Sequence, residues 1–188
     1  MLAVRQLGKR FGSRWLFRDV EFDLLAGQAL VVLGANGSGK STLLRTIAGL
    51  VPASVGSVEV EGPLGMSTLE LALYPQLTAE EHLEFSGAMR GCDPRIAELL
   101  SQVGLEAAAQ VPAGRYSTGM KARLRMAMAI QHRPKVLLLD EPGAGLDEKG
   151  RALTEAICAT QRSEGVLVLA TNDPSERRFG THELELGS

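Results

Sequence analysis

The sequence predicts an α/β fold built around a mostly parallel β-sheet. Three uninterrupted apolar runs, at residues 29–33, 136–139 and 166–170, have the composition of strands that are buried on both faces. Patterns typical of helices separate these runs. Strands that alternate with helices generally form a parallel sheet with helices packed on its faces.

The N-terminal part of the chain is expected to contribute an antiparallel region beside that sheet. Strand patterns occupy Leu2–Leu7, Val20–Leu24 and Val58–Glu61. The strict alternation of apolar and polar residues in Val20–Leu24 favours a half-solvated antiparallel strand. Between the first two strands, we expect Lys9–Trp15 to form a turn that carries two aromatic residues.

The middle of the chain, from about residue 67 to residue 114, is predicted to be helical. Thr78–Arg90 and Pro94–Val103 have helical patterns, and Asp93 stands where a helix cap would precede Pro94 at the first position. Because no buried strand pattern interrupts this segment, we expect a small helical subdomain inserted into the sheet-containing core.

The last third of the chain returns to alternating helices and strands. Helices are predicted over Thr118–Gln131, which Pro134 ends, and over Glu148–Ser163. A final alternating segment, Glu183–Leu186, is a candidate strand.

Composition indicates one ordinary globular domain. The 188 residues are 45% hydrophobic and 22% charged, with 20 basic and 22 acidic residues, so the formal charge of -2 gives no reason to expect a nucleic-acid partner. No segment has the pattern of a signal peptide or a membrane span. Cys92 and Cys158 are isolated from each other and from metal-ligand spacings, which is typical of thiols in a reducing compartment.

A phosphate-binding motif directly follows the first buried run. The pattern G-x-x-x-x-G-K-[ST] fills residues 34–41, and a helical pattern continues from Thr42 until Gly49 caps it. The glycines let successive backbone N–H groups face phosphate oxygens, at the positive end of the helix. We expect Lys40 to contact the β- and γ-phosphates and Ser41 to ligate Mg²⁺. The predicted nucleotide-binding residues here are Gly34, Asn36, Gly37, Ser38, Gly39, Lys40, Ser41 and Thr42.

A second polar group follows the buried run at residues 136–139. Asp140 is predicted to hold the Mg²⁺ that bridges the β- and γ-phosphates. Its neighbour Glu141 could polarise the attacking water as a general base. Taken alone, such an acidic pair could also be a solvated turn, but together with the phosphate loop it indicates a nucleoside triphosphate hydrolase.

The segment Tyr116–Lys121 precedes a helix and resembles the signature motif of the nucleotide-binding subunits of ABC transporters. Its form, YSTGM, is similar to that of exporter ATPases, including the haem-exporter ATPases of cytochrome c maturation. The resemblance implies that Ser117, Thr118 and Gly119 close over the γ-phosphate bound by the opposite subunit of a dimer. A plain helix cap at Ser117 is the alternative.

This resemblance also implies the arrangement of the whole chain. Residues 1–188 would form a single ABC-type ATPase domain of the P-loop NTPase class. Such a domain has an antiparallel β subdomain, a mostly parallel core sheet and an inserted helical subdomain. The helical subdomain would comprise about residues 67–114 and the signature helix that follows.

Two further segments resemble parts of the family pattern. Gly143–Asp147 is similar to the D-loop, which lies at the dimer interface. Phe11 is placed like the aromatic residue that stacks on adenine, with Trp15 as the competing candidate. A buried core role for either aromatic residue is the alternative.

The entrance to the helical subdomain departs from the family pattern. The family usually has a glutamine there that contacts magnesium and the attacking water. Gln76 is tempting, but the match around Leu77 places the expected glutamine seven or eight residues earlier, at Leu69 or Glu70. Leucine cannot ligate a metal, while Glu70 could reach magnesium and would add negative charge. We interpret Gln76 as a coincidental match.

A second departure follows the last apolar run. Asn172 stands where the family usually has a histidine that contacts the γ-phosphate. The three histidines that the chain does contain, His82, His132 and His182, are expected at the surface. Because Asn172 keeps an amide donor that cannot titrate, we expect a slow ATPase.

The function that the resemblance implies is ATP hydrolysis coupled to transport, with ATP and Mg²⁺ bound. The chain would form a dimer with itself or with a paralogous ATPase subunit around two ATP molecules. It would drive a separately encoded integral membrane subunit from the cytoplasmic face of the cell membrane. Two alternatives remain: a soluble ABC ATPase that remodels ribosomes or DNA, and a nucleotide-gated binding module with little hydrolysis.

Overall fold

The computed structural model describes residues 1–187, and its centre is a five-stranded sheet with the order β5-β6-β7-β3-β8. All neighbouring strands in this sheet are parallel. The predicted apolar runs form three of the strands, and every residue of these three is buried. The strands are β3 (Ala29–Leu33), β5 (Leu64–Ser67), β6 (Val136–Asp140), β7 (Val166–Thr171) and β8 (His182–Glu185).

A separate antiparallel sheet has the order β2-β1-β4, as the N-terminal patterns predicted. Its strands are β1 (Leu2–Phe11), β2 (Arg14–Leu24) and β4 (Val55–Val60). The expectation of a turn over Lys9–Trp15 was wrong, because both strands continue through most of that segment. Gly12 adopts a φ of 58°, which glycine tolerates easily, so only Gly12 and Ser13 are needed to reverse the chain.

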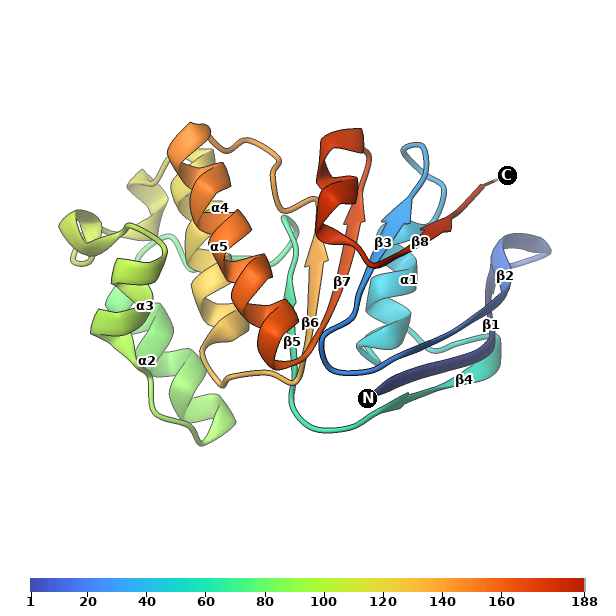
Figure 1. Ribbon diagram of the computed structural model, residues 1–188. Coiled ribbons are helices and arrows are strands. Elements are labelled where there is room, and N and C mark those ends of the chain that lie inside the picture. Colours follow the sequence, from blue (N-terminus) through green and yellow to red (C-terminus); the bar gives the residue numbers. More distant parts are fainter. Residues whose placement is uncertain (188) are drawn as a thin grey trace.

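The parallel sheet separates two hydrophobic cores. One face packs against α1 (Lys40–Ile47) and the antiparallel sheet, and the other packs against α4 (Thr118–Ile130) and α5 (Glu148–Glu164) (Figure 1). Because successive strand residues point to opposite faces, Val31 belongs to one core and Val32 to the other. The carboxyl ends of the parallel strands meet at the edge drawn uppermost in Figure 1.

The helical face contains the predicted helices, with boundaries shifted by one or two residues. The helices are α2 (Ala79–Arg90), α3 (Ile96–Gln102), α4 (Thr118–Ile130) and α5 (Glu148–Glu164), with 3₁₀ turns η1 (Glu106–Ala108), η2 (Ala113–Arg115) and η3 (Pro174–Phe179). The predicted start of a helix at Pro94 was wrong. Asp93 accepts a hydrogen bond from the Arg95 amide at 2.8 Å, and Arg95 adopts a φ of 47°, so α3 begins only at Ile96.

The strand β5 was not predicted, and it is short. Gly65 lies in its centre, where a Cβ atom would lie 2.2 Å from the carbonyl oxygen of Ala129 in α4. Glycine therefore allows α4 to pack closely on the sheet, although it weakens the strand pattern in the sequence. Among the helices of residues 1–187, none has the length and hydropathy needed to cross a bilayer.

The expectation that the histidines lie at the surface was right only for His182. His82 is 1% exposed, because its Nε2 accepts a hydrogen bond from the Tyr74 amide at 3.0 Å while Nδ1 lies 2.7 Å from the Thr78 carbonyl oxygen. His132 is half-buried against Leu64, and burial lowers its pKa. The imidazole of His82 thus ties the segment before α2 to the helix itself.

Candidate active site

Polar residues follow four neighbouring strands of the parallel sheet at the same edge. The glycine loop follows β3, Thr68 follows β5, Glu141 follows β6 and Asn172 follows β7. Open α/β sheets bind their ligands at this carboxyl edge. The fold therefore brings together residues that lie more than a hundred positions apart in the sequence.

The glycine loop is tightly packed, so that little space remains beside Gly34 and Gly39. A Cβ atom at Gly34 would lie 2.5 Å from the Ser38 Oγ and 2.6 Å from the Leu186 carbonyl oxygen. At Gly39, which adopts a φ of 105°, a Cβ atom would lie 2.8 Å from the Leu16 side chain. Larger residues at either position would push the loop open, so the glycines maintain a narrow cradle that ends at the first turn of α1.

Lys40 is held inside this cradle and is only 5% exposed. Its Nζ donates hydrogen bonds to the carbonyl oxygens of Gly34 at 2.8 Å and Ala35 at 3.3 Å. The Nζ also lies 3.7 Å from the Glu141 Oε1. The hydroxyl of Ser38 is buried without a hydrogen-bond partner among the described residues. A buried cation beside an unsatisfied hydroxyl is a setting that suits phosphate oxygens.

Two hydroxyl groups lie close to the carboxylate of Asp140, which is 7% exposed. The Ser41 hydroxyl donates to Asp140 Oδ1 at 3.0 Å, and the Thr68 hydroxyl lies 3.5 Å from Oδ2. Magnesium prefers oxygen ligands and often takes only one or two from the protein when phosphates supply the others. These residues fit such an ion, and the metal-ligand roles of Ser41 and Asp140 stay predictions.

No local pattern in the sequence indicates Thr68, because its place beside Asp140 depends on the pairing of β5 with β6. Ser67 lies opposite Leu139 in the sheet, so Thr68 comes next to Asp140. Leu69 and Glu70, the two residues considered for the position of the family's glutamine, do not lie beside Asp140. Leu69 is 41% exposed, and the Glu70 carboxylate pairs with Arg45 on α1. Knowledge of the pairing between β5 and β6 would have identified Thr68. The sequence of β5 was too weak a strand pattern for that pairing to be predicted.

Glu141 and Asn172 meet beside the phosphate loop. The Asn172 amide N–H donates to Glu141 Oε2 at 3.4 Å, and the Asn172 side-chain amide donates to Asn36 Oδ1 at 3.1 Å. Glu141 adopts a φ of 49°, which is unusual for a residue other than glycine and is often found at functional sites. The strained turn directs the carboxylate toward the Lys40 ammonium group.

A pocket of about 250 Å³ opens at this point. Its lining residues are Leu16, Asn36, Gly37, Gly39, Lys40, Ser41, Thr42 and Glu141. The arrangement could bind a polyphosphate through the loop, hold a divalent cation at Ser41 and Asp140, and accept a proton at Glu141.

The two candidate aromatic residues lie on the β1–β2 hairpin, and neither is buried. Phe11 is 59% exposed, with the Lys9 ammonium group 4.9 Å from its ring centroid. Trp15 is 39% exposed and lies beside the Arg10 guanidinium group. The alternative of a core role is therefore wrong for both. The choice between them for stacking on adenine stays a prediction, and the apolar residue that lines the pocket is Leu16.

The residues that resemble the signature form the start of α4, outside this pocket. Ser117 caps the helix by accepting a hydrogen bond from the Met120 amide at 3.2 Å, and Ser117 and Thr118 are exposed. A Cβ atom at Gly145 would lie 3.2 Å from the Thr118 side chain. The predicted D-loop thus packs against the start of the signature helix.

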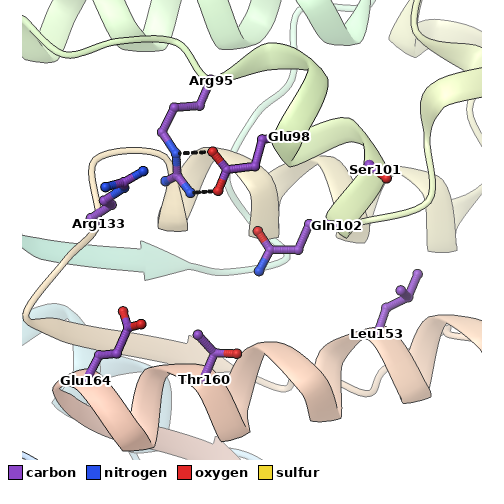
Figure 2. A pocket seen from close by; sticks show the side chains of 8 residues that line it. All are labelled: Arg95, Glu98, Ser101, Gln102, Arg133, Leu153, Thr160 and Glu164. Carbon is purple, nitrogen blue, oxygen red and sulfur yellow. Dashed lines mark hydrogen bonds and ion pairs between the residues drawn. The ribbon is translucent and has the colours of Figure 1, made fainter.

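A second, polar cavity of about 820 Å³ lies between α3 and α5 (Figure 2). Arg95 donates from Nε to Glu98 at 2.9 Å and from Nη1 to the Ile130 and Gln131 carbonyl oxygens at 3.2 and 3.0 Å. It therefore satisfies the last carbonyls of α4 and fixes the start of α3 beside them. Since Arg133 precedes β6 and Glu164 precedes β7, this cavity extends to the edge of the sheet opposite the phosphate loop.

Comparison with known protein families gives one match to most of the chain. The family described as "ABC transporter" matches residues 17–144. Among solved structures, the dimeric structure of MJ0796, a bacterial ABC transporter cassette, has a TM-score of 0.86 at 24% identity and covers 99% of this chain and 94% of that chain. This likeness confirms the predicted fold class.

Curated relatives are similar in sequence as well. The linearmycin resistance ATP-binding protein LnrL of Bacillus subtilis (strain 168) is 36% identical, over 80% of this chain and 54% of the relative. The cytochrome c biogenesis ATP-binding export protein CcmA of Rhizobium meliloti (strain 1021) is 38% identical, over 92% of this chain and 91% of the relative. The chain spans only 54% to 62% of the length of LnrL and of two uncharacterised Bacillus subtilis relatives, YdbJ and YxlF.

Proposed function

The chain belongs to the ABC transporter family, and from this premise we propose that it is the ATP-binding and ATP-hydrolysing subunit of a transporter. The observation that carries the proposal is the convergence of Lys40, Glu141 and Asn172 beside the phosphate loop. A phosphate cradle alone would support binding. A carboxylate held at the same point supports hydrolysis as well.

In this proposal, the loop amides and Lys40 bind the β- and γ-phosphates of ATP. Ser41 and Asp140 would hold Mg²⁺, and a bound ion would supply positive charge to neutralise the same phosphates. Glu141 orients a water molecule and accepts its proton as the water oxygen attacks the γ-phosphorus and the bond to ADP breaks. The side-chain amide of Asn172 donates a hydrogen bond to the γ-phosphate and stabilises the charge that develops there.

We place the whole chain in one ABC ATPase domain with a helical subdomain at about residues 67–114 and α4. One hydrophobic core supports this reading, because it joins Leu83 and Leu99 of the helical segment to Leu137 and Leu169 of the sheet. The helical segment therefore reaches the sheet through α4, against which α2 and α3 pack, and needs no core of its own.

The active form in this proposal is a dimer with a second copy or with a paralogous ATPase subunit. The pocket at the phosphate loop receives none of its described lining residues from Ser117, Thr118 or Gly119. The N-terminus of a helix is suited to bind an anion, and Ser117 and Thr118 are exposed there, so the signature of one subunit would close over the γ-phosphate held by the other.

An exposed apolar patch beside α2 is the proposed contact with a membrane subunit. Tyr74, Phe85 and Met89 are 56%, 49% and 73% exposed, and the rings of Tyr74 and Phe85 meet edge to face at 6.1 Å. Leu83, which also belongs to the apolar stripe of α2, is fully buried. An amphipathic helix of the membrane subunit would lie on this patch at the cytoplasmic face. The export function named for CcmA supports an exporter.

A second candidate function is a nucleotide-gated binding module with little hydrolysis. Asn172 at the γ-phosphate position and Leu69 near the entrance to the helical segment favour it, because neither residue can act as an acid or base. The two functions differ in whether bound ATP is cleaved.

Steady-state phosphate release from the purified chain, with and without the membrane subunit, tests the proposal. We expect Mg²⁺-dependent release that Glu141→Gln abolishes while a fluorescent ATP analogue still binds. Gln76→Ala is the control, because Gln76 is exposed and does not line the pocket. Tight ATP binding without phosphate release would favour the binding module.

A further inference from the structure

Glu176 is a buried carboxyl group that has no part in the proposed chemistry. It lies on η3, four residues after Asn172, and is 8% exposed. Its Oε2 has no hydrogen-bond partner among residues 1–187. Burial raises the pKa of this carboxyl group, and the nearby carboxylates of Asp173 and Glu141 raise it further. Such a costly group requires a structural or functional explanation.

The carboxyl group of Glu176 occupies the space beside Gly143. A Cβ atom at Gly143 would lie 2.4 Å from the Glu176 Oε1, which is closer than such atoms can approach. Gly143 does not have a positive φ, so its backbone conformation would accept alanine. Glycine is needed here because Glu176 comes so close. Interactions with the Thr171 side chain and the Gly143 backbone lower the pKa of the carboxyl group and partly offset the effect of burial.

Gly143 lies in the loop that joins the candidate base to α5. Glu141 begins this loop, and its carbonyl oxygen accepts a hydrogen bond from the Ala144 amide at 3.1 Å. On the other side of the loop, Gly145 packs against Thr118 at the start of the signature helix. The loop is thus held between Glu176 and α4.

We propose that Glu176 is a positioning residue that fixes the 141–147 loop relative to the Asn172 turn. Through this contact, Glu141 keeps its place beside Lys40, and Thr118 keeps its support from Gly145. The inference rests on the proposed function, since it assigns Glu176 to the positioning of the base. Glu176 itself does not touch the reacting atoms.

Hydrogen exchange tests the contact without requiring hydrolysis. In Glu176→Ala, the amides of residues 143–146 should exchange at least severalfold faster than in the parent, while β6 stays protected. Glu155→Ala is the matched control, because the exposed Glu155 also contacts the η3 segment, through Arg178 at 3.0 Å. Unchanged exchange in Glu176→Ala would overturn the inference.

A double-mutant cycle tests the consequence for turnover. A displacement of a catalytic group by about 1 Å can cost on the order of a hundredfold in rate, and we expect Glu176→Ala and Gly143→Ala each to lower kcat about tenfold. The KM for ATP and the thermal midpoint should change little. The conservative variant Glu176→Gln, which keeps an acceptor for the Gly143 amide, should recover most of the loss.

The double variant Gly143→Ala with Glu176→Ala decides between a shared contact and two independent effects. In the double variant, the shorter side chain at residue 176 makes room for the methyl group added at residue 143. The kcat of the double variant should therefore be no lower than that of Gly143→Ala alone. Multiplied losses would overturn the inference. A parent chain that binds ATP but releases no phosphate would overturn the proposed hydrolysis, and the hydrogen-exchange result would still decide the contact.

Discussion

The side-chain amide of Asn172 donates a hydrogen bond to the side-chain oxygen of Asn36, with the two atoms 3.1 Å apart. This contact joins the end of β7 to the loop that follows β3. It places an uncharged donor where the resemblance to the family had led us to expect a histidine.

Replacing Asn172 should change turnover more than nucleotide binding. Loss of a well-placed donor to a transition state typically costs on the order of a hundredfold or more in rate. Because Asn172 is a short donor, we expect Asn172→Ala to lose about tenfold in kcat, and Asn172→His to equal or exceed the parent. Phosphate release measures both. If Asn172→Ala hydrolyses ATP as fast as the parent, Asn172 does not contact the γ-phosphate.

Lys40→Ala should weaken the binding of Mg–ATP. Its ammonium group is the cation buried among the loop carbonyls, and the loss of a charge-assisted contact costs on the order of 2 kcal/mol or more. Titration of a fluorescent ATP analogue gives the affinity. Lys149→Ala removes the same charge from an exposed position on α5 and should bind like the parent. Equal affinities in all three proteins would refute the assigned phosphate site.

Thr68→Val should raise the Mg²⁺ concentration needed for hydrolysis. Valine keeps the shape of threonine but removes the hydroxyl beside Asp140. Groups that orient a metal ligand are typically worth about tenfold in metal affinity. Glu70→Ala should have little effect, because Glu70 pairs with Arg45. The reverse result, a large effect for Glu70→Ala alone, would indicate that Glu70 and not Thr68 takes the place of the expected glutamine.

Cys158 should resist alkylation in the native protein. Burial raises the pKa of its thiol to about 12, so the reactive thiolate is scarce near neutral pH. Cys92 is only half-buried and should react first with iodoacetamide. Mass spectrometry of the modified peptides measures the order. Cys158 should react after denaturation, and fast labelling of native Cys158 would contradict the packing around it.

Glu176 should make the stability of the protein depend on pH. A carboxyl group whose pKa is raised by folding contributes its stability below its ordinary pKa, and the contribution is lost as the pH rises through the raised value. The groups near it are the carboxyls of Asp173 and Glu141 and the thiol of Cys158. The thermal midpoint of the parent should therefore fall more between about pH 5 and pH 8 than that of Glu176→Gln. Parallel curves would show that Glu176 titrates normally.

The strands of the central sheet could be predicted where burial on both faces left a wholly apolar run. This holds for β3, β6 and β7. It fails for β5, because Gly65 interrupts the apolar pattern of this strand. The glycine is there to let α4 pack closely, and such a contact cannot be recognised from neighbouring residues. The turn at Lys9–Trp15 was predicted too long, since the chain reverses within Gly12 and Ser13 and the positive φ of Gly12 permits so short a turn.

The site divides in the same way. Phosphate-loop residues act through spacing along one segment, so a motif reveals them. The roles proposed for Thr68 and Glu176 depend on partners 72 and 33 positions away, at Asp140 and Gly143, and neither residue has a local signal. His82 was placed at the surface because nothing in its neighbours indicates that its two ring nitrogens are used within the fold.

The pairing of β8 with β3 offers a practical way to observe nucleotide binding. Leu186 donates a backbone hydrogen bond to Leu33 at 2.8 Å, and a Cβ atom at Gly187 would lie 3.1 Å from the Ser38 side chain. A fluorophore attached through a cysteine at Gly187 would therefore sit against the phosphate loop. Its emission should report when the loop is filled, while a bulky affinity tag at the same position would obstruct the loop and is better carried elsewhere.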